Sequence, residues 1–122
     1  MQLDITDLTY EGTWYDFGDG KLKIRPYPAS KSDVVFRDGS LVITGENQYE
    51  IFSYCLEEWK DFVDADGKPL ALTDAVKQKV FDFQLAGIPL FVLNKVRRFE
   101  QEKAGREKNS LTGRAGSSKK TR

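Results

Sequence analysis

The sequence predicts an α+β protein in which two β-hairpins precede three helices and a basic C-terminal tail. Within residues 13–43, two pairs of strand-like runs each flank a short loop that contains glycine. From residue 46 to about residue 103, apolar side chains recur at steps of three and four, which is typical of amphipathic helices. A length of 122 residues suits one domain. We therefore expect a single folded domain over residues 1–103 and a disordered basic tail over residues 104–122.

The first predicted hairpin joins residues 13–17 to residues 21–25 across a Gly-Asp-Gly loop, and its second run alternates polar and apolar residues. The second predicted hairpin joins residues 34–36 to residues 41–43, whose side chains are apolar or β-branched. An Asp-Gly pair between these two runs suits a turn whose central residues have positive φ. We expect the hairpins to form a small antiparallel sheet.

The first predicted helix covers residues 46–60, with Thr44 or Gly45 at its N-terminal cap. Its apolar face is defined by four residues at steps of three, four and three, namely Tyr49, Phe52, Leu56 and Trp59. Cys55 borders this face and is the single cysteine of the chain. One thiol cannot form an internal disulfide, and its position favours a buried, inert side chain.

The second predicted helix begins after Thr73 as its N-cap and ends near Ala86, with Gly87 as a C-cap. Pro89 suits the first turn of a third helix. Five apolar residues give the second helix an unusually wide apolar arc: Val76, Val80, Phe81, Phe83 and Leu85. Such a helix is either enclosed in a core or presents an apolar patch to a partner. These five residues are therefore the candidate partner-binding surface.

The composition argues against catalytic and metal-binding chemistry. The sequence has no histidine, which removes the commonest general base and the commonest metal ligand. A calcium-binding loop starting at Asp64 would need glycine and glutamate where the chain has Pro69 and Ala75. The segment from Asp64 to Gly67 is therefore predicted to be a tight turn. We expect no catalytic residue, no cofactor and no metal site, and hence a protein that is not an enzyme.

The sequence also predicts the cellular compartment of the protein. No apolar stretch approaches the roughly 20 residues of a membrane-spanning helix. The first four residues lack the basic and apolar regions of a signal peptide. A cytoplasmic protein with no membrane partner is the expectation.

Charge is distributed unevenly along the chain. Residues 1–94 carry 16 acidic and 9 basic side chains, a net charge of −7, whereas residues 95–122 carry 3 acidic and 10 basic side chains, a net charge of +7. Lys119, Lys120 and Arg122 are candidate contact residues in the tail. This asymmetry predicts either that the tail meets an anionic partner or that it folds back on its own acidic body. No aromatic residue interleaves with these bases, so a protein partner is favoured over nucleic acid.

Several segments together resemble a known family. In residues 54–70 a predicted helix reaches a tryptophan and an Asp-Gly-Lys-Pro-Leu turn follows, before the paired helices. The Trp-Tyr-Asp-Phe-Gly run at residues 14–18, the Ile-Arg-Pro run at residues 24–26 and the charged segment at residues 102–110 fit the same pattern. Over residues 13–110 the chain resembles the tail assembly chaperones of tailed phages and prophages, which are encoded near the tape measure gene.

The resemblance implies a chaperone without enzymatic activity that works in the cytoplasm of a bacterial host. Such a protein coats the tape measure protein, helps to recruit tail-tube subunits and is absent from the finished virion. On this hypothesis the wide apolar arc binds the tape measure protein, as a groove binds an amphipathic helix, while the basic tail contacts another tail component.

Two other functions stay open at this point. A structural tail or head-completion subunit would remain in the virion, and its hairpins would add strands to neighbouring subunits. A nucleic-acid-binding regulator would use the basic tail, and its binding would fall steeply with salt. The sequence does not define the oligomeric state.

Overall fold

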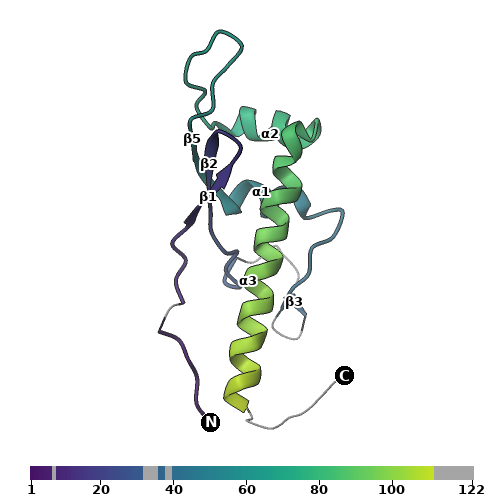
Figure 1. Cartoon of the computed structure of the whole chain (residues 1–122). Helices are drawn as coiled ribbons and strands as arrows, with labels where there is room; N and C mark the ends of the chain where they lie inside the picture. Colours follow the sequence, from purple (N-terminus) through teal and green to yellow (C-terminus); the bar gives the residue numbers. More distant parts are fainter. Residues whose placement is uncertain (7, 32–35, 38–39, 112–122) are drawn as a thin grey trace.

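The structure is a computed structural model that describes residues 1–6, 8–31, 36–37 and 40–111. It confirms the predicted α+β class (Figure 1). The elements in chain order are β1 (Thr13–Phe17), β2 (Gly20–Ile24), β3 (Phe36–Arg37), β4 (Ser40–Leu41), α1 (Gln48–Cys55), β5 (Leu56–Lys60), α2 (Asp74–Asp82), the short 3-10 helix η1 (Leu85–Gly87) and α3 (Ile88–Leu111). In Figure 1 α3 runs along the molecule, and α2 lies across its upper end.

The main sheet has the order β1-β2-β5 and is antiparallel throughout. The first predicted hairpin is confirmed, since β1 pairs with β2 from Thr13 opposite Ile24 to Phe17 opposite Gly20. Its loop requires glycine at Gly18, where φ is +58°. The second predicted hairpin is present in shortened form as β3 and β4, which have two residues each and form a separate two-stranded sheet. Residues 34–35 of its first predicted strand and the Asp-Gly pair of its predicted turn lie outside the described residues.

The predicted helix over residues 46–60 is wrong in its last five residues. Helix α1 ends at Cys55, and the chain continues directly as β5, the third strand of the main sheet. The pairing register with β2 shifts within β5, because Ile24 lies opposite Leu56 whereas Lys23 lies opposite Glu58. This β-bulge inserts one extra residue, so Leu56 and Trp59 both face the core at a spacing of three. The bulge therefore gives the core-facing residues of β5 a spacing that is typical of a helix, and this is why the sequence pattern predicts a helix here.

Helix α1 begins two to three residues later than a cap at Thr44 or Gly45 would place it. Its N-cap position is held by Asn47, and Thr44 supports this residue instead of capping the helix itself. The Thr44 backbone N–H donates to Asn47 Oδ1 at 2.7 Å, and the Asn47 N–H donates to Thr44 Oγ1 at 3.3 Å. The reciprocal bonds fix the chain direction at the helix start.

The predicted cap of α2 is confirmed, because Thr73 Oγ1 accepts a hydrogen bond from the Val76 N–H at 3.2 Å. The helix ends at Asp82, before the predicted end near Ala86. Helix α3 has Pro89 in its first turn, as expected. It runs to Leu111, beyond the predicted domain boundary at residue 103, and the remainder of the predicted tail lies outside the described residues.

The core lies between the inner face of the main sheet and the helices α1 and α3. Its fully buried members are Leu22, Ile24, Ile51, Phe52, Cys55, Leu56 and Val92. Two residues of β1 extend this contact, since the rings of Tyr15 and Phe17 meet Phe91 of α3 edge-on at 6.4 and 5.0 Å between centroids. No helix in the described part of the chain is long and apolar enough to cross a membrane.

Candidate functional site

The connection between α2 and α3 exposes three large apolar side chains. Phe83 is 73% exposed, Leu85 48% and Leu90 59%. We call these three residues the junction surface. Phe83 and Leu85 belong to the predicted apolar arc, whereas Leu90, in the first turn of α3, was not recognised from the sequence. Neighbouring large apolar side chains that stay in water mark a candidate contact site, whereas single exposed apolar residues are common on protein surfaces.

The other members of the predicted arc serve the core of the protein. Val80 is 4% exposed, and Val76 is partly buried against the core. The ring of Phe81 lies 5.2 Å from that of Tyr49 and 5.5 Å from that of Phe52, between centroids. The predicted arc thus combines two groups of residues. The residues up to Phe81 pack in the core, and Phe83 and Leu85 face solvent.

The junction surface sits on a strained backbone. Gln84, Ala86 and Gly87 have φ values of +49°, +55° and +71°. The left-handed region costs a residue with a Cβ atom about 1–2 kcal/mol, and only glycine occupies it freely. Strain of this kind at two non-glycine residues is typical of functional segments. The chain turns tightly here from α2 into α3, and Phe83 and Leu85 stay in solvent.

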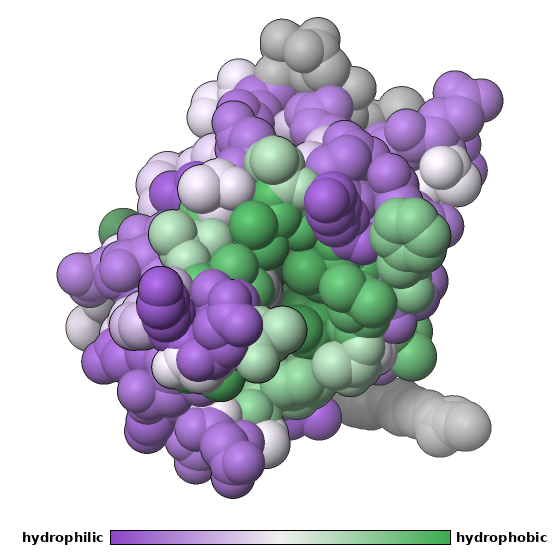
Figure 2. Space-filling model, turned by 90° about the horizontal axis from the view of Figure 1, so that it is seen from above, coloured by the Kyte–Doolittle hydropathy of each residue, from purple (hydrophilic) through white to green (hydrophobic). Residues whose placement is uncertain are grey.

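Figure 2 views the molecule from above, toward the end that carries α2 and the beginning of α3. A continuous hydrophobic area occupies the centre of this face, and hydrophilic residues surround it (Figure 2). An apolar centre within a polar rim is the usual composition of a protein–protein contact surface.

Two other groups singled out in the sequence have structural roles. Burial raises the pKa of the Cys55 thiol to about 12, so the reactive thiolate is not populated at neutral pH. Asp64 Oδ1 accepts hydrogen bonds from the N–H groups of Asp66 and Lys68 at 2.9 and 3.0 Å, and Gly67 has φ of +79°. The predicted tight turn is confirmed. Within the described residues, no three His, Cys, Asp or Glu side chains come together as metal ligands.

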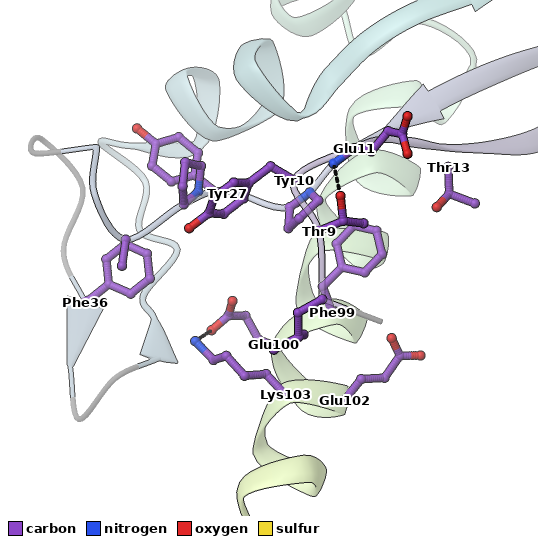
Figure 3. Close-up of a pocket in the computed structure, with 14 residues that line it drawn as sticks. Thr9, Tyr10, Glu11, Thr13, Tyr27, Phe36, Phe99, Glu100, Glu102 and Lys103 are labelled. Carbon is purple, nitrogen blue, oxygen red and sulfur yellow. Dashed lines mark hydrogen bonds and ion pairs between the residues drawn. The ribbon is translucent and has the colours of Figure 1, made fainter. Parts of the chain in front are cut away.

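A pocket of about 570 Å³ lies away from the junction surface, where the N-terminal segment passes α3 (Figure 3). Its walls come from residues 8–13, the loop at residues 26–29, β3 and the part of α3 at residues 99–103. Leu8, Tyr10, Phe36 and Phe99 provide an apolar lining. No sequence pattern predicts this pocket, because its walls come from segments that lie as far apart in the chain as residue 8 and residue 103.

The pocket also has an acidic side. Glu100 Oε1 accepts a hydrogen bond from the Leu41 N–H at 2.9 Å, and this bond attaches β4 to α3. The same oxygen forms an ion pair with Lys103 Nζ at 3.1 Å. Glu11 and Glu102 line the pocket and are exposed. These carboxylates outnumber the one lysine of the lining, so the pocket suits a ligand with apolar stems and positive charge.

The tail residues Lys119, Lys120 and Arg122 lie outside the described residues, so their predicted role in partner binding stays a prediction. Comparison of the chain with protein-family models, with curated proteins and with solved structures found no match.

Proposed function

We propose that the protein is a non-enzymatic binding protein whose junction surface receives the apolar face of an amphipathic helix. The observation that carries this proposal is the exposure of Phe83, Leu85 and Leu90 beside a backbone held at positive φ. An amphipathic helix binds such a surface through apolar residues spaced three and four apart along its own sequence. The polar rim of the site then excludes water from the contact.

The helical partner that we propose is a tape measure protein of a tailed phage or prophage. The support is the resemblance of residues 13–110 to tail assembly chaperones, together with a surface suited to long amphipathic helices. In this role the protein shields the tape measure protein in the bacterial cytoplasm, helps to bring in tail-tube subunits and leaves before the virion is complete.

The test is co-expression of the full chain with the tape measure protein encoded in the same phage or prophage genome. We expect the two proteins to co-purify and the tape measure protein to stay in the soluble fraction. Replacing Phe83 and Leu85 together by aspartate should abolish both effects, because a charge in a desolvated apolar contact is strongly unfavourable. The matched control is Leu3→Asp, since Leu3 is also largely exposed, at 63%, and lies on the N-terminal segment.

Three outcomes would contradict the proposal. Co-purification that survives in the Phe83 and Leu85 variant would show that another surface binds the tape measure protein. Recovery of the protein in purified virions would favour a structural tail or head-completion subunit. Recovery of nucleic acid alone, lost at high salt, would favour a regulator that acts through the basic tail.

A further inference from the structure

The pocket beside α3 combines apolar walls with carboxylates. Phe36 and Phe99 supply aromatic faces from β3 and α3, on two sides of the pocket (Figure 3). Glu11 and Glu102 add negative charge on the N-terminal segment and on α3. Lysine and arginine side chains suit such a lining, because their methylene stems cover apolar surface while their charged ends meet carboxylates. Guanidinium and ammonium groups also bind aromatic faces.

We propose that the pocket binds the C-terminal segment of the same chain, residues 112–122. This segment carries four basic side chains and no acidic one, and thus complements the pocket. Its bases are Arg114, Lys119, Lys120 and Arg122. The proposal is independent of the junction surface, which lies at the other end of the molecule (Figure 1).

The length of the chain permits this contact. Helix α3 ends at Leu111, and Lys103 is one of the pocket residues, so about 12 Å of helix separates the pocket from the helix end at 1.5 Å per residue. Eleven further residues span up to about 36 Å when extended. Gly113 and Gly116 give the returning chain access to turn conformations. The segment can therefore reverse after Leu111 and reach the pocket with length to spare.

A bound tail has a consequence for recognition. The four bases would be held against the protein's own carboxylates and would be withheld from an anionic partner. A partner that binds the tail must then displace it from the pocket, so the tail is released only where a competing acidic surface is present at sufficient concentration.

Paramagnetic relaxation in the full chain tests the proposal. Ser118→Cys introduces a thiol that takes a nitroxide label, whereas Cys55 is fully buried and stays unlabelled. We expect broadening of backbone amide signals in residues 8–11 and 99–103, and none in the turn from Asp64 to Lys68 at the other end of the molecule. Raising the salt concentration should reduce the broadening, because exposed charges are screened.

A matched pair of charge reversals gives the control. In the labelled chain Glu102→Lys should weaken the contact, since loss of one exposed ion pair lowers a binding constant about 1.5- to 5-fold and the new lysine repels the tail. Asp66→Lys makes the same change of charge in the distant turn and should leave the broadening unchanged. Pocket signals that are not broadened, or that respond equally to the two reversals, would overturn the proposal.

A mixed sample distinguishes binding within one chain from binding between copies. Isotope-labelled protein without nitroxide is combined with unlabelled protein that carries the nitroxide at residue 118. We expect no broadening at the pocket in this sample. Broadening there would show that the tail of a second copy occupies the pocket, and the proposal of binding within the chain would be wrong.

Discussion

Lys77 Nζ donates a hydrogen bond of 2.6 Å to the backbone carbonyl of Ser53, 24 residues earlier in the chain. Ser53 lies in the last turn of α1, which contains no basic residue of its own. Arg25 completes this arrangement from the end of β2, because its Nε donates to the Tyr54 carbonyl at 2.8 Å and its guanidinium lies 3.9 Å from the Tyr54 ring. Two cations from other elements therefore cap the negative end of the α1 dipole.

Replacing Lys77 by methionine should lower the free energy of unfolding by about 1–2 kcal/mol. The substitution keeps an apolar stem but removes a half-buried charged hydrogen bond and the stabilisation of the helix end. The measurement is urea unfolding followed by tryptophan fluorescence at neutral pH. Lys79→Met is the control, since Lys79 lies on the exposed side of α2 and its loss should change stability by less than about 0.5 kcal/mol. Equal effects of the two substitutions would contradict the capping role.

The sequence predicts elements best where the signal is local. The Gly-Asp-Gly loop, the Thr73 cap and the Asp64 turn each depend on a few adjacent residues, and each forms as expected. The end of α1 depends on pairing between β5 and β2, which are more than 30 residues apart, and a bulge at Glu57 gives this strand a helical spacing. No local propensity encodes such a contact.

The candidate site shows the same limit. Phe83 and Leu85 could be predicted as apolar members of a wide arc, but their exposure depends on where α2 ends. That end is set by positive φ at Gln84 and Ala86, which are not residues with a preference for the left-handed region. The pocket depends on contacts between the N-terminal segment and residues 99–103 of α3, which only the folded chain brings together.

Stability should fall at alkaline pH through Cys55. Burial raises the pKa of its thiol from 9.0 to about 12. Below pH 9 both the folded and the unfolded thiol are protonated, and the stabilising effect of the raised pKa is fully present. Between about pH 9 and 12 the unfolded chain loses this proton while the folded chain keeps it, so the free energy of unfolding decreases, by about 4 kcal/mol over three pH units.

Cys55→Ala separates this effect from other alkaline titrations. The substitution leaves a small cavity whose cost is the same at every pH, whereas the thiol contribution is removed. Burial and Glu102 raise the pKa of Tyr15 and Cys55 plays no part in this shift, so the titration of Tyr15 is common to both proteins and cancels in the comparison. In urea unfolding at pH 8 and pH 11 the wild-type protein should lose more stability than the variant. Parallel pH profiles would show that the Cys55 thiol does not have the raised pKa.

The turn that follows β5 is fastened by a second long-range hydrogen bond. Trp59 Nε1 donates to the Leu70 carbonyl at 2.7 Å, and the Trp59 ring stacks on Phe62 at 4.5 Å between centroids. Trp59→Phe keeps an aromatic ring but removes the donor, so we expect a loss of about 1 kcal/mol. Amide hydrogen exchange of residues 62–70 should become faster. Trp14→Phe is the control, and exchange in this segment should not respond to it.

Ala86→Gly should stabilise the folded protein, although the same change usually destabilises a helix. Ala86 has φ of +55°, and glycine removes the steric cost of that conformation. Part of the gain is offset by the greater freedom of glycine in the unfolded chain, so we expect a net increase of about 0.5–1 kcal/mol. Ala75→Gly, inside α2, should instead lower stability by about 0.5–1 kcal/mol. Urea unfolding of both variants gives the two signs, and a loss of stability in Ala86→Gly would show that residue 86 is not strained.

The same variant connects backbone strain to binding. If the tight turn at residues 84–87 holds Phe83 and Leu85 in the orientation that receives a helix, glycine at residue 86 frees the turn and raises the entropy lost on binding. On the proposed function, Ala86→Gly should then bind the tape measure protein more weakly than the wild-type protein does, while being more stable. Co-purification and thermal unfolding on the same preparation measure both quantities. A variant that is more stable and binds equally well would show that the backbone strain does not contribute to binding. The exposed side chains of the junction surface alone would then determine the contact.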